Sequence, residues 1–315
     1  MTNKLYFEKA AIIGVGLIGG SLAMIMKQKG IAGHITGVGR GKENLNTAKR
    51  LGLVDECTLE AAEGVKDADL VIAAVPVLKI EAVIKAAAPH LKKGCIVTDV
   101  GSVKQAIVDI VEPLMPEGVH FVPGHPIAGK EVSGAACADA DLFVGKRCVL
   151  TPTENTDKGA LAKIRTLWQE AGSEVVIMDA ESHDWILAAT SHLPHVVAYM
   201  LVNTVSEVGG SGRKGMDIFK LSAGGFRDTT RIASSPAEMW SDICGMNKRA
   251  LSEIMENFQK RLDVMKRLIQ SNDITGINKE FARAKSFRDS FNPKPRGHEG
   301  PCEHEHKHDH DCDHD

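Results

Sequence analysis

The chain is poor in aromatic residues, in long apolar stretches and in net charge, and each shortage excludes a class of protein. Aromatic residues make up only 4% of the 315 residues, so aliphatic and alanine side chains must fill the interior. No run of about 18 uninterrupted apolar residues occurs, so no membrane span is expected. The formal net charge of −3 gives no basic surface for nucleic acid.

Cysteine is also scarce, and its spacing is irregular. Five of the seven cysteines lie singly in apolar or helical context, where a free buried thiol is expected: Cys57, Cys95, Cys137, Cys148 and Cys244. This usage favours a reducing, cytoplasmic compartment. The mixed-charge N-terminus leads directly into a first strand, so we do not interpret it as a signal peptide.

Short apolar runs alternate with helical stretches through residues 1–178. Strands are expected at Ala10–Val15, His34–Val38, Leu70–Ala74, Ile96–Asp99, Val119–Val122, Arg147–Leu150 and Val175–Met178. The helices between them are expected at Gly19–Gln28, Lys42–Leu51, Ala82–Ala88, Val103–Leu114 and Lys158–Ala171. This alternation predicts βαβ units, and therefore an α/β domain built on a Rossmann-type, mostly parallel sheet.

The pattern changes near Asp179, after which no strand signal occurs. Residues 179–290 are predicted to form an all-helical second domain, with helices over His183–Val208, Ala237–Ile269 and Thr275–Phe287. The sequence after Phe291 has no apolar positions to bury, so we predict a disordered tail over residues 291–315.

The sequence Gly14–Gly19 matches G-x-G-x-x-G between a strand and a helix. The first glycine permits a tight turn, the second lets the backbone approach a pyrophosphate, and the third permits close helix–strand packing. The expected cofactor-binding positions are Gly14, Gly16, Leu17, Ile18 and Gly19. A glycine-rich turn of purely structural use is the alternative.

The acidic residue that usually holds the ribose 2′-hydroxyl is missing from the end of the second strand. Arg40 and Lys42 lie where a 2′-phosphate would bind, so NADP, or either cofactor, is favoured over NAD alone. Alternatively, Arg40 stacks on the adenine. Val75 and Pro76 end the next strand and are expected to border the cofactor, although a strand-terminating proline explains them equally well.

Two loops at strand ends carry candidate catalytic groups. Ser102 lies in DVGSVK, where its hydroxyl can cap the following helix or bind a substrate hydroxyl or an imidazole. His125 lies between Gly124 and Pro126 in GHPIAG. Because an imidazole titrates near neutrality, His125 is a candidate general base, with a structural loop histidine as the alternative.

The helical half contains SHLPH, at residues 191–195, and GGFRDTTRIA, at residues 224–233. Histidines and arginines beside a glycine-rich break are suited to pairing with substrate carboxylates. Taken singly, each could equally be a surface charge.

In this order, GVGLIGGSLA, DVGSVK, GHPIAG, SHLPH and GGFRDTTRIA followed by Trp240 resemble the prephenate dehydrogenase family over about residues 8–287. The resemblance implies a nucleotide-binding domain and a helical dimerisation domain, a homodimer with sites completed between subunits, and oxidative decarboxylation of prephenate with NAD(P)+.

The resemblance also implies residue roles. His125 is similar to the catalytic base, and Ser102 to its hydrogen-bonding partner. The residues similar to substrate-binding positions are His192, Arg231, Glu131, Gly224, Asp228 and Trp240. His195 lies one helical turn from His192, but no role is assigned to it.

Two rival functions remain open at this point. A related dehydrogenase acting on arogenate or a β-hydroxyacid has the same expected architecture. A metal-handling protein is suggested by residues 298–315, which hold six histidines, two cysteines and seven acids. Four of these histidines alternate with charged residues and could bind a divalent metal: His304, His306, His308 and His310.

Overall fold

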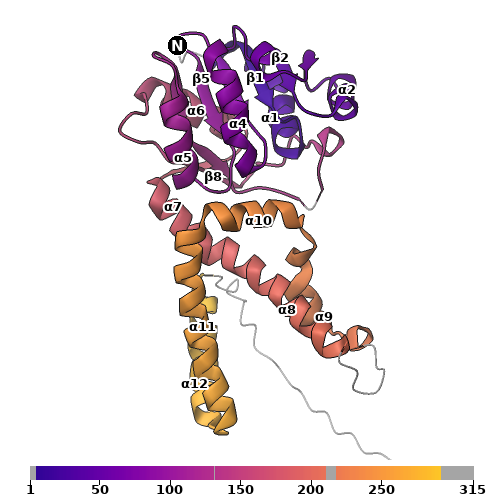
Figure 1. Cartoon of the computed structure of the whole chain (residues 1–315), viewed down its shortest axis with the longest axis vertical. Coiled ribbons are helices and arrows are strands. Elements are labelled where there is room, and N and C mark those ends of the chain that lie inside the picture. Colours follow the sequence, from indigo (N-terminus) through magenta and orange to yellow (C-terminus); the bar gives the residue numbers. More distant parts are fainter. Residues whose placement is uncertain (1–4, 131, 211–217, 292–315) are drawn as a thin grey trace, which may run out of the picture. The chain divides into compact units, whose positions relative to one another are not determined.

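The computed structural model describes residues 5–130, 132–210 and 218–291 of the chain. The chain forms two compact units, Met1–Met255 and Glu256–Asp315. The first unit begins with an α/β domain and continues into helices (Figure 1).

The α/β domain contains two sheets. Six parallel strands form the first, in the order β3-β2-β1-β4-β5-β6. They are β1 (Phe7–Ile13), β2 (Ala32–Val38), β3 (Glu56–Thr58), β4 (Leu70–Ala73), β5 (Ile96–Asp99) and β6 (His120–Val122). This order reverses direction between β1 and β4, and doubly wound sheets bind ligands in the crevice beyond such a point.

A second, three-stranded sheet adjoins the first. Its strands are β7 (Gly124–Pro126), β8 (Arg147–Leu150) and β9 (Glu174–Ile177). β7 pairs antiparallel with β8, and β8 pairs parallel with β9. Only Pro123 separates β6 from β7, so the chain passes from one sheet to the other immediately before His125.

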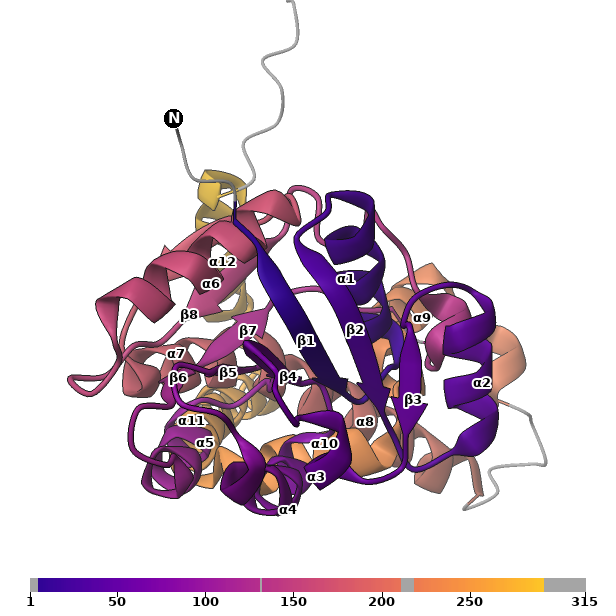
Figure 2. The same ribbon diagram turned by 90° about the horizontal axis from the view of Figure 1, so that it is seen from above.

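Helices cover both faces of the parallel sheet, as Figure 2 shows for β1–β3. They are α1 (Leu17–Gln28), α2 (Lys42–Arg50), α3 (Ala61–Gly64), α4 (Val77–Ala87), α5 (Gln105–Val111) and α6 (Lys158–Glu170). Side chains alternate between two cores along each central strand: Ile12 of β1 packs with α1, α2 and α6, whereas Ile13 packs with α4 and α5. Burial on both faces explains why these strands read as continuous apolar runs.

Among the described residues, only helices follow β9. In the first unit they are α7 (Ala180–Leu187), a π-helical turn (Ala188–His192), α8 (Leu193–Gly210), α9 (Gly224–Thr230) and α10 (Ala237–Met246). Trp240 and Ile243 of α10 belong to the same core as α4 and α5, which attaches the helices to the sheet domain. The predicted fold class is confirmed.

The second unit contains the end of α11 (Lys248–Gln270) and all of α12 (Ile274–Phe291). The turn between them is tight, because Asn272 has φ +54° and the Asp273 carboxylate accepts a hydrogen bond from the Gly276 backbone N–H at 2.8 Å.

Differences from the predicted elements are local. β3 and β7, which have three residues each, were not predicted from the sequence. The predicted helix Ala237–Ile269 is interrupted at Asn247, which ends α10. All five cysteines in the described residues are free, as predicted, but only Cys95 and Cys148 are buried.

Candidate active site

The glycines of Gly14–Gly19 have the geometry that their motif requires. Gly14 has φ +99°, and a Cβ there would lie 2.2 Å from the backbone oxygen of Ala74. A Cβ on Gly19 would lie 2.2 Å from the Gly14 oxygen, whereas one on Gly16 would meet no atom within 4 Å. The turn is therefore tight against β4 but open at Gly16, where α1 begins, which suits the approach of a pyrophosphate.

The end of β2 borders this opening. Arg40 and Lys42 are both exposed. The Asn44 side chain donates to the Val15 backbone oxygen at 2.8 Å and accepts from the Ala135 backbone N–H at 2.8 Å. It therefore joins the glycine turn to the segment that follows β7.

Val75 and Pro76 follow β4. A γ-methyl of Val75 would lie 2.9 Å from a Cβ on Gly14, so this side chain packs on the glycine turn. Pro76 occupies the N-cap position of α4, which explains the proline without any ligand.

His125 lies on β7, and a buried ion pair fixes the backbone beside it. Lys104 and Asp99 are buried and bonded to each other. The Lys104 ammonium also donates to the Gly124 oxygen at 2.8 Å, and Asp99 accepts from the Gly124 N–H at 3.2 Å. Burial lowers the pKa of Lys104, although the charge of Asp99 opposes that shift. Both polar groups of the Gly124 backbone are thus held.

The His125 ring belongs to a chain of hydrogen bonds. Its Nδ1 lies 2.8 Å from Nε2 of His183, and Nδ1 of His183 lies 2.8 Å from Oδ1 of Asp184. The Asp184 carboxylate also accepts from the backbone N–H groups of Lys104 at 2.7 Å and Gln105 at 2.9 Å. This carboxylate therefore ties α7 to the first turn of α5.

The His125 pKa differs from the sequence-based expectation of titration near neutrality. Burial lowers the pKa of His125 well below 6.5, and the nearby groups His183, Lys104 and His192 lower it further. At neutral pH this imidazole is uncharged.

His192 ends the π-helical turn that joins α7 to α8. Two residues later, Pro194 has no backbone N–H and its ring crowds the carbonyl four residues before it, which accounts for the widened turn. Burial lowers the pKa of His192 to about 4. The Asn247 Nδ2 lies 2.8 Å from the Asp184 backbone oxygen and 3.1 Å from Nδ1 of His192.

Asn247 thereby determines which nitrogen of His192 carries hydrogen. A backbone carbonyl only accepts hydrogen bonds, so the Asn247 atom that faces it must be the NH2 group. The second hydrogen of this group points to Nδ1 of His192, which must accept it. A neutral His192 then carries its hydrogen on Nε2.

Aromatic contacts extend the site from His192 towards Arg231. The Trp240 ring lies edge-on to His192 with centroids 6.0 Å apart, and it stacks on His195 at 3.5 Å. The charge of Arg231 contributes to the lowered pKa of His195, after burial and against a backbone hydrogen bond. The structure thus brings together His125, His192, His195, Trp240 and Arg231.

Other predicted residues are not part of this group. Within the described residues, no hydrogen bond joins Ser102 to His125, whose Nδ1 is bonded to His183 instead. Ser102 does not cap α5 either, since Lys104 holds the N-cap position. Gly224 and Asp228 lie exposed on α9. Glu131 and the tail histidines His304, His306, His308 and His310 lie outside the described residues.

Two family descriptions together match most of the chain. Residues 22–177 match the nucleotide-binding domain of prephenate dehydrogenase, and residues 179–283 match its dimerization domain. The chain belongs to the prephenate dehydrogenase family. With its dinucleotide-binding domain, it is an NAD(P)-dependent oxidoreductase.

Relatives of this chain carry different substrate names. Cyclohexadienyl dehydrogenase of Zymomonas mobilis is 37% identical over 90% of this chain and 95% of its own length. Prephenate dehydrogenase of Bacillus subtilis is 34% identical over 91% of this chain and 76% of its own length. Arogenate dehydrogenase of Synechocystis has a crystal structure with TM-score 0.75 and 31% identity, covering 90% of this chain and 99% of that one.

A ligand-bound relative has the same fold. The crystal structure of prephenate dehydrogenase from A. aeolicus, in complex with hydroxyphenyl propionate and NAD+, superposes with a TM-score of 0.85. It is 34% identical and covers 92% of this chain and 100% of that chain.

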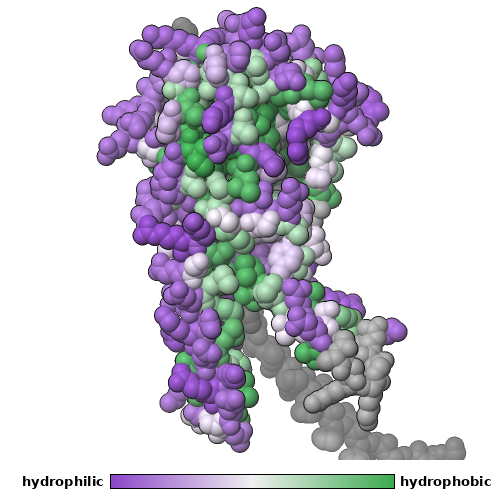
Figure 3. Space-filling view, viewed as in Figure 1, coloured by the Kyte–Doolittle hydropathy of each residue, from purple (hydrophilic) through white to green (hydrophobic). Residues whose placement is uncertain are grey.

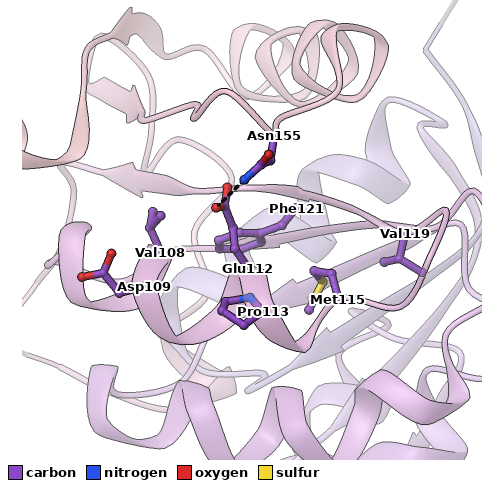
Figure 4. Close-up of a pocket in the computed structure, with 8 residues that line it drawn as sticks. All are labelled: Val108, Asp109, Glu112, Pro113, Met115, Val119, Phe121 and Asn155. Carbon is purple, nitrogen blue, oxygen red and sulfur yellow. Dashed lines mark hydrogen bonds between the residues drawn. The ribbon is translucent and has the colours of Figure 1, made fainter.

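One cavity of this family member lies away from the histidines. It has a volume of about 490 Å³ between α5 and β6 (Figure 4). Its walls are Val108, Asp109, Glu112, Pro113, Met115, Val119, Phe121 and Asn155. Two carboxylates and no arginine or histidine face this space, so it is unsuited to the anionic substrates of a prephenate dehydrogenase.

Sequence reasoning missed His183, Asp184 and Asn247. A signal for Asp184 was present, because Asp184, Ala188, His192 and His195 recur at helical spacing along one stripe of the predicted helix. The role of Asn247 depends on the break between α10 and α11, which the continuous helical pattern concealed.

Proposed function

We propose that the chain catalyses the oxidative decarboxylation of prephenate to 4-hydroxyphenylpyruvate with NAD(P)+, and that His125 is the base. The observation that carries this proposal is that His125, buried and with its pKa lowered by burial, lies on β7 beside the carboxyl end of β5 in the parallel sheet that bears the glycine turn. Gly14 lies against Ala74 after β4, and Gly124 lies against Asp99 at the end of β5. The turn and the base therefore lie beside the carboxyl ends of β4 and β5, which are neighbouring strands.

The residues at the glycine turn fit a dinucleotide, since Gly16 leaves open space before α1. The nicotinamide of the bound cofactor supplies a hydride acceptor. His125 takes the proton of the ring 4-hydroxyl as hydride leaves the same carbon, which yields a dienone whose ring carboxylate is in the vinylogous β-position to the new ketone. Loss of CO2 then gives an aromatic phenolate, and His125 returns the proton to its oxygen. No net proton is released.

His192 and Arg231 hold the substrate in this proposal. A neutral His192 with hydrogen on Nε2 is a donor for a hydroxyl or a carboxylate. Arg231 pairs with a substrate carboxylate through its planar guanidinium. Ser102, although not bonded to His125, follows β5 at the same sheet edge, and we retain it as a partner of the substrate hydroxyl.

Absorbance at 340 nm tests the activity. Prephenate with NADP+ or NAD+ should produce NAD(P)H, with one CO2 released for each hydride transferred. Absence of both products with prephenate would reject the proposal. Arogenate is the second candidate substrate, because relatives are named cyclohexadienyl and arogenate dehydrogenase. Arogenate is assayed in parallel. A much higher kcat/KM with arogenate than with prephenate would make arogenate the assigned substrate.

For the cofactor we propose NADP+, or both cofactors without strong preference, because Arg40 and Lys42 lie exposed after β2 where the ribose acid is missing. Arg40→Ala should lower kcat/KM for NADP+ by about 10-fold or more, as expected from losing a charged hydrogen bond, and change that for NAD+ little. The exposed Arg50→Ala at the end of α2 is a matched control. A hundredfold wild-type preference for NAD+ would contradict the proposal.

We also propose a cytoplasmic homodimer. The helical stretch Ala180–Val208 is long and apolar enough to cross a membrane, although the sequence analysis expected no span. It carries the buried His183, Asp184 and His192, so we interpret its exposed apolar side as a subunit contact. Figure 3 shows apolar side chains along α8. Trp185 of α7 and Met200 of α8 are exposed. Sedimentation of a monomer at micromolar concentration would reject the dimer.

For the tail we propose accessory, adaptable binding of divalent metal by its alternating histidines. Deletion of residues 297–315 should abolish Ni²⁺ or Zn²⁺ binding and leave kcat with prephenate unchanged. Calorimetry with the metal alone, beside the 340 nm assay, measures both. Unchanged metal binding, or collapse of kcat, would contradict the accessory role.

A further inference from the structure

We propose that His183 and Asp184 are positioning residues that keep His125 in the one neutral tautomer able to act as a base. The inference rests on the proposed function for its kinetic consequences, but the tautomer itself follows from the hydrogen bonds. Neither His183 nor Asp184 belongs to the motifs that the sequence analysis singled out.

Asp184 determines the direction in which hydrogen bonds are donated from His125 through His183. Its Oδ1 accepts from the Lys104 backbone N–H at 2.7 Å, and its Oδ2 accepts from the Gln105 N–H at 2.9 Å. Both oxygens are therefore acceptors of hydrogen bonds. Nδ1 of His183, 2.8 Å from Oδ1, must then carry a hydrogen and donate it.

The hydrogen position on His183 determines that on His125. A neutral His183 with hydrogen on Nδ1 has a lone pair on Nε2. That nitrogen lies 2.8 Å from Nδ1 of His125, which must donate. His125 consequently carries its hydrogen on Nδ1 and keeps the lone pair on Nε2. A proton taken from substrate needs this lone pair.

Burial of the three side chains favours this tautomer of His125 over the other. His183 is fully buried, and Asp184 and His125 are 5% and 8% exposed. Water therefore has little opportunity to satisfy the alternative tautomer, whose Nδ1 would leave two lone pairs facing each other across 2.8 Å. The Lys104–Asp99 pair holds the Gly124 backbone, so the ring cannot relax by moving its strand.

Two substitutions of His183 separate positioning from simple packing. Leucine fills the space but cannot accept from His125. Glutamine can accept from His125 with its oxygen and donate to Asp184 with its amide, so it preserves the direction of the chain. We expect His183→Leu to lower kcat with prephenate by about 100-fold and to keep KM within about threefold of the wild-type value. The kcat of His183→Gln should be at least about tenfold higher than that of His183→Leu.

The His125→Asn background tests whether His183 acts through His125. Once the base is removed, adding His183→Leu should lower kcat no further, because there is no tautomer left to set. Independent losses that multiply would overturn the proposal. So would wild-type kcat in His183→Leu.

Asp184 has its own control. Asp184→Asn should lower kcat by about 100-fold or more, as loss of the correct tautomer does in a related histidine–aspartate arrangement. Asp179→Asn is matched to it, because the Asp179 carboxylate also caps a helix, by accepting from the Ser182 N–H at 2.7 Å. Asp179 meets His183 only through its backbone oxygen, which the substitution leaves in place. Equal effects of the two substitutions would indicate a structural role alone.

A spectroscopic readout is independent of turnover and of the folding of any variant. In the full-length wild-type protein labelled with ¹⁵N-histidine, the His125 resonances should show a protonated Nδ1 and an unprotonated Nε2 at pH 7.5. A protonated Nε2 would overturn the inference even if prephenate is oxidised. Failure to oxidise prephenate with the expected tautomer present would reject only the proposed function.

Discussion

His125→Asn should lower kcat with prephenate by about 100-fold or more, the usual scale for loss of a general base. Asparagine fills much of the same space and can still donate a hydrogen bond towards His183, but it cannot take the substrate proton. KM for NAD(P)+ should change little, because the glycine turn lies on a different strand. Initial rates at 340 nm with saturating substrates measure the effect.

His34→Asn provides the control, since His34 lies near the start of β2, at the opposite edge of the sheet from Gly14. It should retain the wild-type kcat. Retention of wild-type turnover by His125→Asn would show that another group is the base.

The pH dependence of the wild-type enzyme has a defined direction. A base acts only when deprotonated, and burial lowers the pKa of His125 well below 6.5. In the free enzyme, kcat/KM should therefore persist below pH 6.5 and fall only as the pH drops through the lowered pKa. An acid limb centred at or above pH 6.5 would contradict the buried, uncharged state.

Lys104→Met should lower the free energy of unfolding by about 3–5 kcal/mol, because it leaves the buried Asp99 carboxylate without its countercharge. Methionine approximates the volume of the lysine chain, so the loss reports charge and hydrogen bonding more than a cavity. The donated bond to the Gly124 oxygen is lost as well. Denaturant unfolding followed by circular dichroism measures the change.

Lys29→Met removes a matched exposed pair. The Lys29 ammonium lies 3.1 Å from Glu170, and both side chains are 48% exposed, so its loss should cost less than about 1 kcal/mol. A similar small loss for Lys104→Met would mean that the buried pair contributes little to stability.

Elements with a strong local pattern were predictable from sequence. β5 and β8 have the predicted bounds, and the sheet and helical regions follow in the predicted order. β3 and β7 were not predictable in the same way, because three-residue strands are too short for periodicity to distinguish them from loops. β7 exists because it pairs with β8, which is a tertiary contact.

The site residues also fall into those that local sequence predicts and those that depend on tertiary contacts. Gly14, His125 and His192 stand in local motifs, so their residue types and spacing were informative. The partner of His125 was predicted as Ser102, which is near in sequence, whereas the bonded partner is His183, 58 residues away. Asn247 reaches His192 across 55 residues. Hydrogen bonds between residues so far apart in the sequence depend on how α7 and α10 pack. A local sequence pattern does not predict that packing.

A crystal structure of the enzyme with NAD(P)+ and 4-hydroxyphenylpyruvate tests the role of His125 most directly. We expect Nε2 of His125 to lie about 2.6–3.2 Å from the 4-hydroxyl oxygen, with Nδ1 still bonded to His183. An imidazole directed away from the ring oxygen, or a different side chain in hydrogen-bond contact with it, would contradict the account.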